Sequence, residues 1–293
     1  MSFMDNRADQ IDINLDGKGL TKFPEDISQW SELKSLSLYK NRLISIPKTI
    51  GNLTQIEILN VAENRLKAVP DELGNLTRLH TLDLGHNELA SLPESLGNLS
   101  RLAFLYLSNN HLTDIPQSFR KLKSLIYLNI TDNQLGRFPG FIGSLPKLVE
   151  LRLYNNQLTE IPETIKSLRK LRELHLHGNR IDSLPKSIGE LTELRKLILE
   201  NNALSLLPES IGKLRQLTEL NLRFNKLTAL PDSIGQMKKL VYLDLRANQL
   251  TSLPESIGDL PRLEKLDLRW NRIPSLPLSV QKLERRGCLI YHQ

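Results

Sequence analysis

The stretch Leu82–Arg101, LDLGHNELASLPESLGNLSR, contains the features that decide the fold. Leu82 and Leu84 alternate with polar residues, which is the period of a short strand with one buried face. Asn87 follows three residues after Leu84, and its amide offers donors and an acceptor to the backbone just past the strand. Pro93 opens a returning arc, because its fixed φ suits the first position of a helical turn. The stretch therefore predicts one short strand followed by one short helical turn.

The asparagine of this stretch recurs every 23 residues without insertion or deletion. The series is Asn41, Asn64, Asn87, Asn110, Asn133, Asn156, Asn179, Asn202, Asn225, Asn248 and Asn271. A fixed period of this length indicates a stack of one supersecondary unit, in which each unit packs only on its neighbours. Stacked asparagine amides predict a continuous ladder inside the coils, and losing one would leave buried backbone groups unsatisfied at a cost of roughly 1–3 kcal/mol.

The repeated pattern Leu-x-x-Leu-x-Leu-x-x-Asn-x-Leu-x-x-Leu-Pro-x-x-Ile-Gly-x-Leu resembles the leucine-rich repeat superfamily. It is most similar to the 23-residue intracellular class of Ras-group and bacterial proteins, from about Gln10 to Leu289. The resemblance implies an α/β fold, a right-handed leucine-rich-repeat solenoid shaped as a horseshoe. Its parallel β-sheet would be concave, with short helical or 3-10 turns on the convex side. A protein-binding role is also implied.

The two ends of the chain depart from the pattern. Residues 1–17 are expected to form an N-terminal cap and an edge strand, with Lys18 standing where an asparagine belongs. Residues 18–284 hold the 23-residue repeats. Residues 285–293 are expected to form a C-terminal cap strand after Gly287 breaks the arc. Both ends thus resemble caps, which predicts a complete module.

The composition excludes several classes of protein. The 293 residues carry a net charge of +6, but acidic residues nearly match the basic ones and no run of five Lys/Arg occurs, so no nucleic-acid tail is indicated. No apolar stretch approaches the ~18 residues of a membrane span, and residues 1–10 do not resemble a secretory signal. A single cysteine, Cys288, suits a reducing compartment. We therefore expect a cytoplasmic protein, with delivery into a host cell left open.

Residues between the buried leucines should point outward from the strands into the concave face. Five of the six tyrosines fall in these outward columns, and Tyr, Trp and Arg are enriched in interface hot spots. The alternative is that aromatic residues suit strand surfaces and pack on one another. We predict a partner-binding site formed by Tyr39, Phe104, Tyr106, Tyr127, Tyr154, His175, His177, Arg223, Phe224, Tyr242, Arg246, Arg269 and Trp270.

The arginine column of this site has two interpretations. Arg223, Arg246 and Arg269 lie beside a column that includes Asp244 and Asp267. They form either a self-neutralising ladder of exposed ion pairs, each of little energetic value, or an anchor for an acidic partner. The interleaved acids disfavour a nucleic-acid groove, because they cancel the attraction to phosphates.

The two histidines share one strand face with several carboxylates. His175 and His177 lie near Glu150, Glu173 and Glu200 in neighbouring columns. Such groups can bind a divalent metal or make partner binding sensitive to protonation, but they are more often simple polar residues. We expect no metal and no cofactor.

No catalytic motif is recognisable in the sequence. No histidine stands where it would be expected to activate Cys288 as a nucleophile. No glycine-rich loop of the kind that binds phosphate is present either. We therefore expect a non-catalytic, monomeric scaffold for signalling that binds a protein partner on its concave face, without nucleic acid or membrane. The alternatives are a substrate-recognition domain of a kinase-, GTPase- or ubiquitin-ligase-associated protein, or a self-associating structural element.

Overall fold

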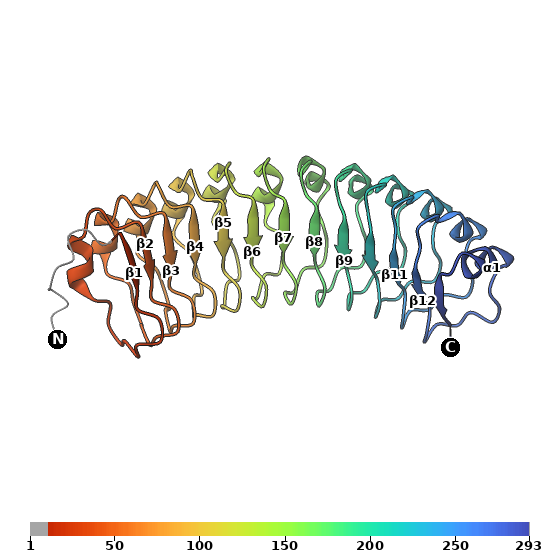
Figure 1. Cartoon of the computed structure of the whole chain (residues 1–293), viewed down its shortest axis with the longest axis horizontal. Coiled ribbons are helices and arrows are strands. Elements are labelled where there is room, and N and C mark those ends of the chain that lie inside the picture. The colour runs from red at the N-terminus through yellow and green to blue at the C-terminus, as the bar shows by residue number, and fades with distance from the viewer. Residues whose placement is uncertain (1–10, 293) are drawn as a thin grey trace. The chain divides into compact units, whose positions relative to one another are not determined.

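The computed structural model describes residues 11–292, which fall into two compact units that divide after Gln134. The segment 1–10, expected to belong to the N-terminal cap, lies outside the described residues. In each unit, short parallel strands lie side by side, and short helices lie along one side of them (Figure 1). The predicted parallel sheet with short helical turns is confirmed.

The first unit contains six three-residue strands and five short 3-10 helices. The strands are β1 (Asp12–Asn14), β2 (Ser35–Ser37), β3 (Ile58–Asn60), β4 (Thr81–Asp83), β5 (Phe104–Tyr106) and β6 (Tyr127–Asn129). The 3-10 helices are η1 (Glu25–Gln29), η2 (Lys48–Asn52), η3 (Asp71–Asn75), η4 (Glu94–Asn98) and η5 (Gln117–Lys121). β1 pairs in parallel with β2, with Asp12 opposite Ser35.

The second unit repeats this plan with seven strands. They are β7 (Glu150–Arg152), β8 (Glu173–His175), β9 (Lys196–Ile198), β10 (Glu219–Asn221), β11 (Tyr242–Asp244), β12 (Lys265–Asp267) and β13 (Leu289–Tyr291). The helices are η6 (Gly140–Ser144), η7 (Glu163–Ser167), η8 (Lys186–Glu190), η9 (Glu209–Lys213), η10 (Asp232–Gln236), η11 (Glu255–Asp259) and α1 (Leu278–Arg285). Among residues 11–292, no helix combines the length and the apolar character that crossing a bilayer requires.

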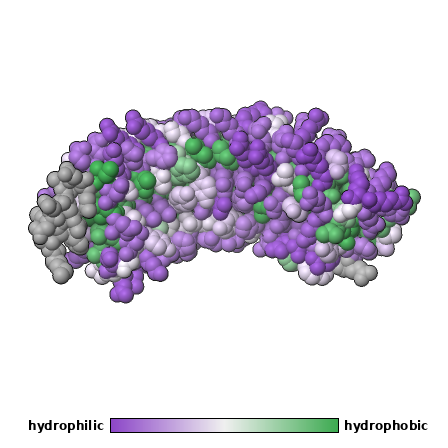
Figure 2. All heavy atoms as spheres, in the orientation of Figure 1, coloured by the Kyte–Doolittle hydropathy of each residue, from purple (hydrophilic) through white to green (hydrophobic). Residues whose placement is uncertain are grey.

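Strand register follows the sequence period. Thr81 lies opposite Phe104, 23 residues later, and the central Leu82 lies opposite Leu105. These central leucines are 0–1% exposed, so the leucines fill the interior while the neighbouring strand residues face outward. Correspondingly, the surface in Figure 2 is mostly hydrophilic.

The asparagine ladder forms as predicted. The Asn87 Nδ2 group donates to the carbonyl oxygens of Leu84 (3.1 Å) and of Val61 in the preceding coil (3.1 Å). Its Oδ1 atom accepts a hydrogen bond from the Leu66 amide at 3.0 Å. One amide thus closes the bend after its own strand and ties two coils together.

The helical turns begin after proline and stack closely. Pro93 precedes η4, and the Glu94 carboxylate accepts a hydrogen bond at 2.9 Å from the Ser118 amide of the next coil. An acidic residue at this place favours the positive N-terminal end of its own turn. The structure adds that it satisfies an amide of the following turn, as Glu163, Glu209 and Glu255 also do.

Glycine closes these turns because the coils approach closely there. A Cβ atom on Gly212 would lie 2.4 Å from the Ser233 carbonyl oxygen of the next coil. In the last coil, Gln281 stands at this glycine position. The turn there continues as the eight-residue helix α1 instead of a 3-10 helix, and one extra residue separates β13 from β12 in register.

Candidate functional site

The sheet face of each coil is built from four outward positions. In strands β2 to β12, the first and third residues flank a buried leucine, as Phe104 and Tyr106 flank Leu105 in β5. The other two positions follow the strand, and the second of them directly precedes the asparagine. That residue has a positive φ at ten non-glycine positions, between 50° and 60°. The chain therefore turns sharply after every strand.

In the first unit, the predicted aromatic residues pack against neighbouring rings. The rings of Tyr106 and Tyr127 lie 4.9 Å apart, and Phe104 lies 5.3 Å from the ring of His80. Each of the three predicted residues is half-buried. Each of these rings is thus partly covered by a neighbouring ring and partly open on the sheet face.

Tyr39 is tied to its neighbour on the same face. Its hydroxyl donates a 2.6 Å hydrogen bond to Glu63, and this bond raises the pKa of Tyr39. Asp83, two strands away in the same unit, has a raised pKa because of burial. Polar contacts therefore hold both Tyr39 and Asp83 on this part of the face.

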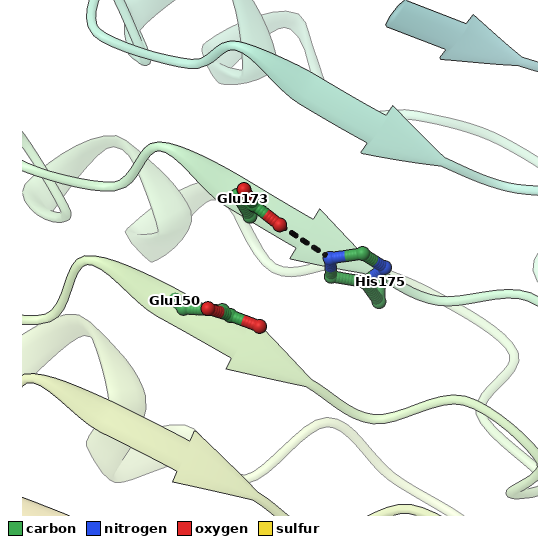
Figure 3. A group of neighbouring side chains, drawn as sticks. All are labelled: Glu150, Glu173 and His175. Carbon is green, nitrogen blue, oxygen red and sulfur yellow. Dashed lines mark hydrogen bonds and ion pairs between the residues drawn. The ribbon is translucent and has the colours of Figure 1, made fainter.

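In the second unit, the two histidines make different contacts. The His177 ring stacks on Tyr154 with centroids 4.1 Å apart and planes 15° from parallel. The His175 Nε2 atom lies 3.1 Å from the Glu173 carboxylate, and Figure 3 shows the two side chains pointing toward each other. Of the two histidines, only His175 has a ring nitrogen in the close cluster with Glu150 and Glu173.

Glu150, Glu173 and His175 form a cluster whose ligand atoms lie within 4.8 Å of one another (Figure 3). Both carboxylates already have cationic partners, because Arg152 lies 2.5 Å from Glu150 and Lys196 lies 3.2 Å from Glu173. Burial raises the pKa of Glu173, but the hydrogen bonds from His175 and Lys196 outweigh it, so the pKa lies below the ordinary value. A divalent metal would have to displace two ion pairs, so the local chemistry suits a charge network better than a metal site.

The arginine column is paired within the face. Arg246 lies 2.5 Å from Asp244 and 3.5 Å from Asp267, and Arg269 lies 2.6 Å from the same Asp267. Arg223 pairs with Glu200 of the preceding coil. The Asp267 side chain is buried, which raises its pKa, but the Arg269 hydrogen bonds outweigh this and hold the pKa below its usual range. The arginines are therefore compensated and held in fixed orientations.

Two strongly exposed aromatic residues lie on the sheet face of the second unit. Phe224 and Trp270 are 46% and 61% exposed, and their stacked rings have centroids 6.4 Å apart. Their φ angles are 53° and 60°, a left-handed conformation that is rare for bulky residues. Arg223 lies over Phe224 at 5.6 Å and Arg269 over Trp270 at 5.8 Å. Two large rings are thus held outward on constrained backbone, against oriented guanidinium groups.

The prediction omitted one aromatic residue that the structure adds to this group. Tyr291 in β13 is 40% exposed, and the guanidinium of Arg269 lies 5.1 Å from its ring centroid. Tyr242 in β11 is 49% exposed. The alternation of β13 could have identified Tyr291, since Leu289 and Tyr291 occupy the outward positions of that strand. We call Phe224, Tyr242, Trp270 and Tyr291 the C-terminal aromatic group.

Chemistry that requires a reactive nucleophile has little support among the described residues. Burial raises the pKa of the Cys288 thiol to about 11, so the thiolate is scarce near neutral pH. A shallow cleft of about 180 Å³ lies on the sheet face between Glu219, Tyr242, Asp244 and Lys265. Its volume is below the usual range of ~300–1,000 Å³ for small-molecule pockets.

Comparisons with known proteins agree with this architecture. A family profile described as a leucine-rich repeat region matches residues 71–175 and 133–226, and a second, described as leucine rich repeat, matches residues 215–273. No curated protein matches the chain significantly.

Three solved structures illustrate the range of similar proteins. A leucine-rich repeat protein of Leptospira interrogans is 38% identical with a TM-score of 0.90, over 95% of this chain and 71% of that one. An internalin of Listeria monocytogenes is 24% identical with a TM-score of 0.79, over 96% and 86% of the two chains, which shows the fold alone. The plant peptide hormone receptor RGFR1, solved in complex with RGF2, is 26% identical with a TM-score of 0.60, over 92% of this chain and 57% of the receptor chain.

Proposed function

The chain belongs to the leucine-rich repeat family, and from this premise we propose that it is a non-catalytic scaffold that binds a protein partner on its sheet face. The observation that carries the proposal is the exposure of the rings of Phe224 and Trp270 on left-handed backbone. For an L-residue this conformation costs about 1–2 kcal/mol. The repeat imposes this conformation, since eight other non-glycine residues at the same position share it, and what distinguishes Phe224 and Trp270 is the large exposed ring that each places there.

The composition of this surface supports a protein partner. Aromatic residues and arginine dominate the centres of protein interfaces, where water is excluded. The C-terminal aromatic group combines rings that are 40–61% exposed with arginines oriented by buried or half-buried acids. The arginines need little reordering on binding, which lowers the entropic cost of association.

The first unit offers a second group of contacts. Tyr39 and the cluster of Phe104, Tyr106 and Tyr127 lie on the sheet face of that unit. Because these rings already bury part of their area against one another, we expect smaller contributions from them than from Phe224 and Trp270. Tyr154, stacked on His177, would contribute in the same way within the second unit.

The test compares two triple variants. Phe224→Ala/Tyr242→Ala/Trp270→Ala removes exposed rings from the sheet face, and Ile44→Ala/Ile126→Ala/Leu206→Ala removes exposed apolar side chains from segments outside the strands. Hot-spot truncations cost about 2 kcal/mol or more each, so the first variant should weaken partner binding by at least ~100-fold. The second should bind nearly as the wild type does. Equal binding by all three proteins, with unchanged circular dichroism, would reject the proposal.

We further propose that the protein works as a monomer in the cytoplasm. The support for the compartment is the cysteine content. The sequence has a single cysteine, Cys288, which is free and buried, so the chain has no internal disulfide of the kind that is common in proteins of oxidising compartments. Light scattering over a range of concentrations should give a constant monomer mass. A mass that doubles with concentration would favour the self-associating alternative.

A further inference from the structure

Charge is distributed unevenly between the two units. Residues 1–134 contain 14 basic and 16 acidic residues, a net charge of −2, whereas residues 135–293 contain 25 and 17, a net charge of +8. The excess in the second unit does not lie on its sheet face. On that face we count the first and third residues of each strand from β7 to β12, and also the residue two places after each strand. These positions carry six basic and six acidic residues, so their charges cancel. The positive charge must lie elsewhere on the coils.

It lies on the segments that lead from each helical turn into the next strand. We call residues 143–149, 166–172, 189–195, 212–218, 235–241, 258–264 and 281–288 the turn-to-strand edge. It contains 14 basic and five acidic residues, a net charge of +9, and all 14 cations are exposed. They are Lys147, Lys166, Arg169, Lys170, Arg172, Arg195, Lys213, Arg215, Lys238, Lys239, Arg262, Lys282, Arg285 and Arg286.

The backbone aligns these segments in a row. The Arg195 amide donates to the Arg172 carbonyl oxygen, and the Thr218 amide donates to that of Arg195, both at 2.8 Å. With strands about 4.8 Å apart, the seven segments span roughly 30 Å. Within residues 11–292, the only edge cations in ion pairs are Arg169 and Lys213, which share Glu190. The edge is therefore a continuous band of positive charge with little internal compensation.

An exposed apolar residue lies at one end of this band. Leu278 begins helix α1 and is 74% exposed. Lys282 and Arg285 follow it at i+4 and i+7, so one face of α1 carries a leucine and two cations. Basic charge beside an insertable apolar side chain is the combination that holds a peripheral protein on an anionic bilayer.

We propose that the turn-to-strand edge of the second unit binds an anionic lipid surface. The seven segments contain no Phe, Tyr, Trp or His, so they offer neither the stacking platforms of single-stranded nucleic-acid sites nor the aromatic anchors of a protein interface. Lysine and arginine side chains are attracted electrostatically to a negatively charged bilayer surface and need no specific binding pocket for this. Docking through this edge leaves the sheet face of the same unit open to a protein partner.

The experiment is co-sedimentation of the full chain with vesicles of phosphatidylcholine alone and of phosphatidylcholine and phosphatidylserine at three to one. Binding to the mixed vesicles only, weakening as salt rises, is expected. Lys170→Gln/Lys239→Gln/Arg262→Gln should lower the partition coefficient about 100-fold, since each cation near the surface contributes about a factor of five. Leu278→Ser should lower it about 10-fold, and this loss should persist at high salt.

The matched control is Arg180→Gln/Lys226→Gln/Arg272→Gln. It removes the same charge from exposed residues beyond the other end of the strands. The control should bind mixed vesicles nearly as the wild type does. Equal loss in both triple variants would overturn the proposal, as would equal binding to neutral vesicles. If the protein binds duplex DNA through this edge and does not bind mixed vesicles, the edge is a nucleic-acid site instead. Capture of the protein partner by the sheet face should be unchanged in the edge variant, which separates this test from that of the proposed function.

Discussion

The asparagine ladder can be tested by converting one amide into a carboxylate, Asn225→Asp. In the native protein, Asn225 Nδ2 donates to the carbonyl oxygens of Leu199 and Leu222, both at 3.0 Å. Its Oδ1 atom accepts from the Leu204 amide, also at 3.0 Å. The new carboxylate keeps the acceptor but places negative charge against those carbonyl oxygens. At about 1–3 kcal/mol for each buried group left unsatisfied, the loss of stability at pH 7 should be about 3 kcal/mol or more.

The substitution also makes stability depend on pH in a defined direction. Burial beside carbonyl oxygens raises the folded-state pKa of the new carboxyl above its unfolded value of about 3.9. Between these two pKa values the folded state binds more protons than the unfolded state, so stability falls as pH rises. The variant should therefore be closest to the wild type below about pH 4 and lose stability progressively above it.

The assay is urea unfolding followed by circular dichroism from pH 4 to pH 7, together with hydrogen exchange at the Leu204 amide. The control is Asn201→Asp, which changes an exposed asparagine at the position that Asp132 occupies in another coil. The control should stay within about 0.5 kcal/mol of the wild type. An Asn225→Asp protein as stable as wild type at pH 7, or one that gains stability from pH 5 to pH 7, would refute the account of the ladder.

Three further outcomes are expected. Gly212→Ala should destabilise the protein by about 1–3 kcal/mol in urea unfolding, because its Cβ would meet the Ser233 carbonyl oxygen at 2.4 Å, whereas Gly136→Ala, with open space around it, should not. Trp270→Gly should be at least as stable as Trp270→Ala by thermal unfolding, reversing the usual order, because glycine adopts the left-handed backbone without strain. Cys288 should react with iodoacetamide far more slowly at pH 8 than a free thiol, and faster as pH approaches about 11.

The repeat period made much of the fold predictable. An uninterrupted spacing of 23 residues leaves one register, so the parallel strands, their buried central leucines and the amides of residues such as Asn87 could be placed from the sequence alone. Strand alternation likewise placed Tyr106 and Tyr127 on the outward side. These features depend on backbone periodicity, which the sequence displays directly.

Other features depend on contacts between coils that one repeat does not contain. The hydrogen bond from the Ser118 amide to Glu94 joins two turns, and the stack of His177 on Tyr154 depends on the rotamers of two neighbouring strands. The sequence contained a signal that could have predicted the left-handed backbone at Phe224 and Trp270. The same column contains glycine, asparagine and aspartate at several repeats, the residues that most readily adopt positive φ. The prediction assigned this column to the binding face without identifying its conformation.

The measurement that tests the central claim most directly is hydroxyl-radical footprinting of the protein alone and with its captured partner. Exposed aromatic and leucine side chains are labelled in the free protein, so Phe224, Tyr242 and Trp270 report on the sheet face and Leu206 reports on a loop outside it. Binding on the sheet face predicts strong protection of the three aromatic residues and unchanged labelling of Leu206. Protection of Leu206 with full labelling of the three rings would contradict it.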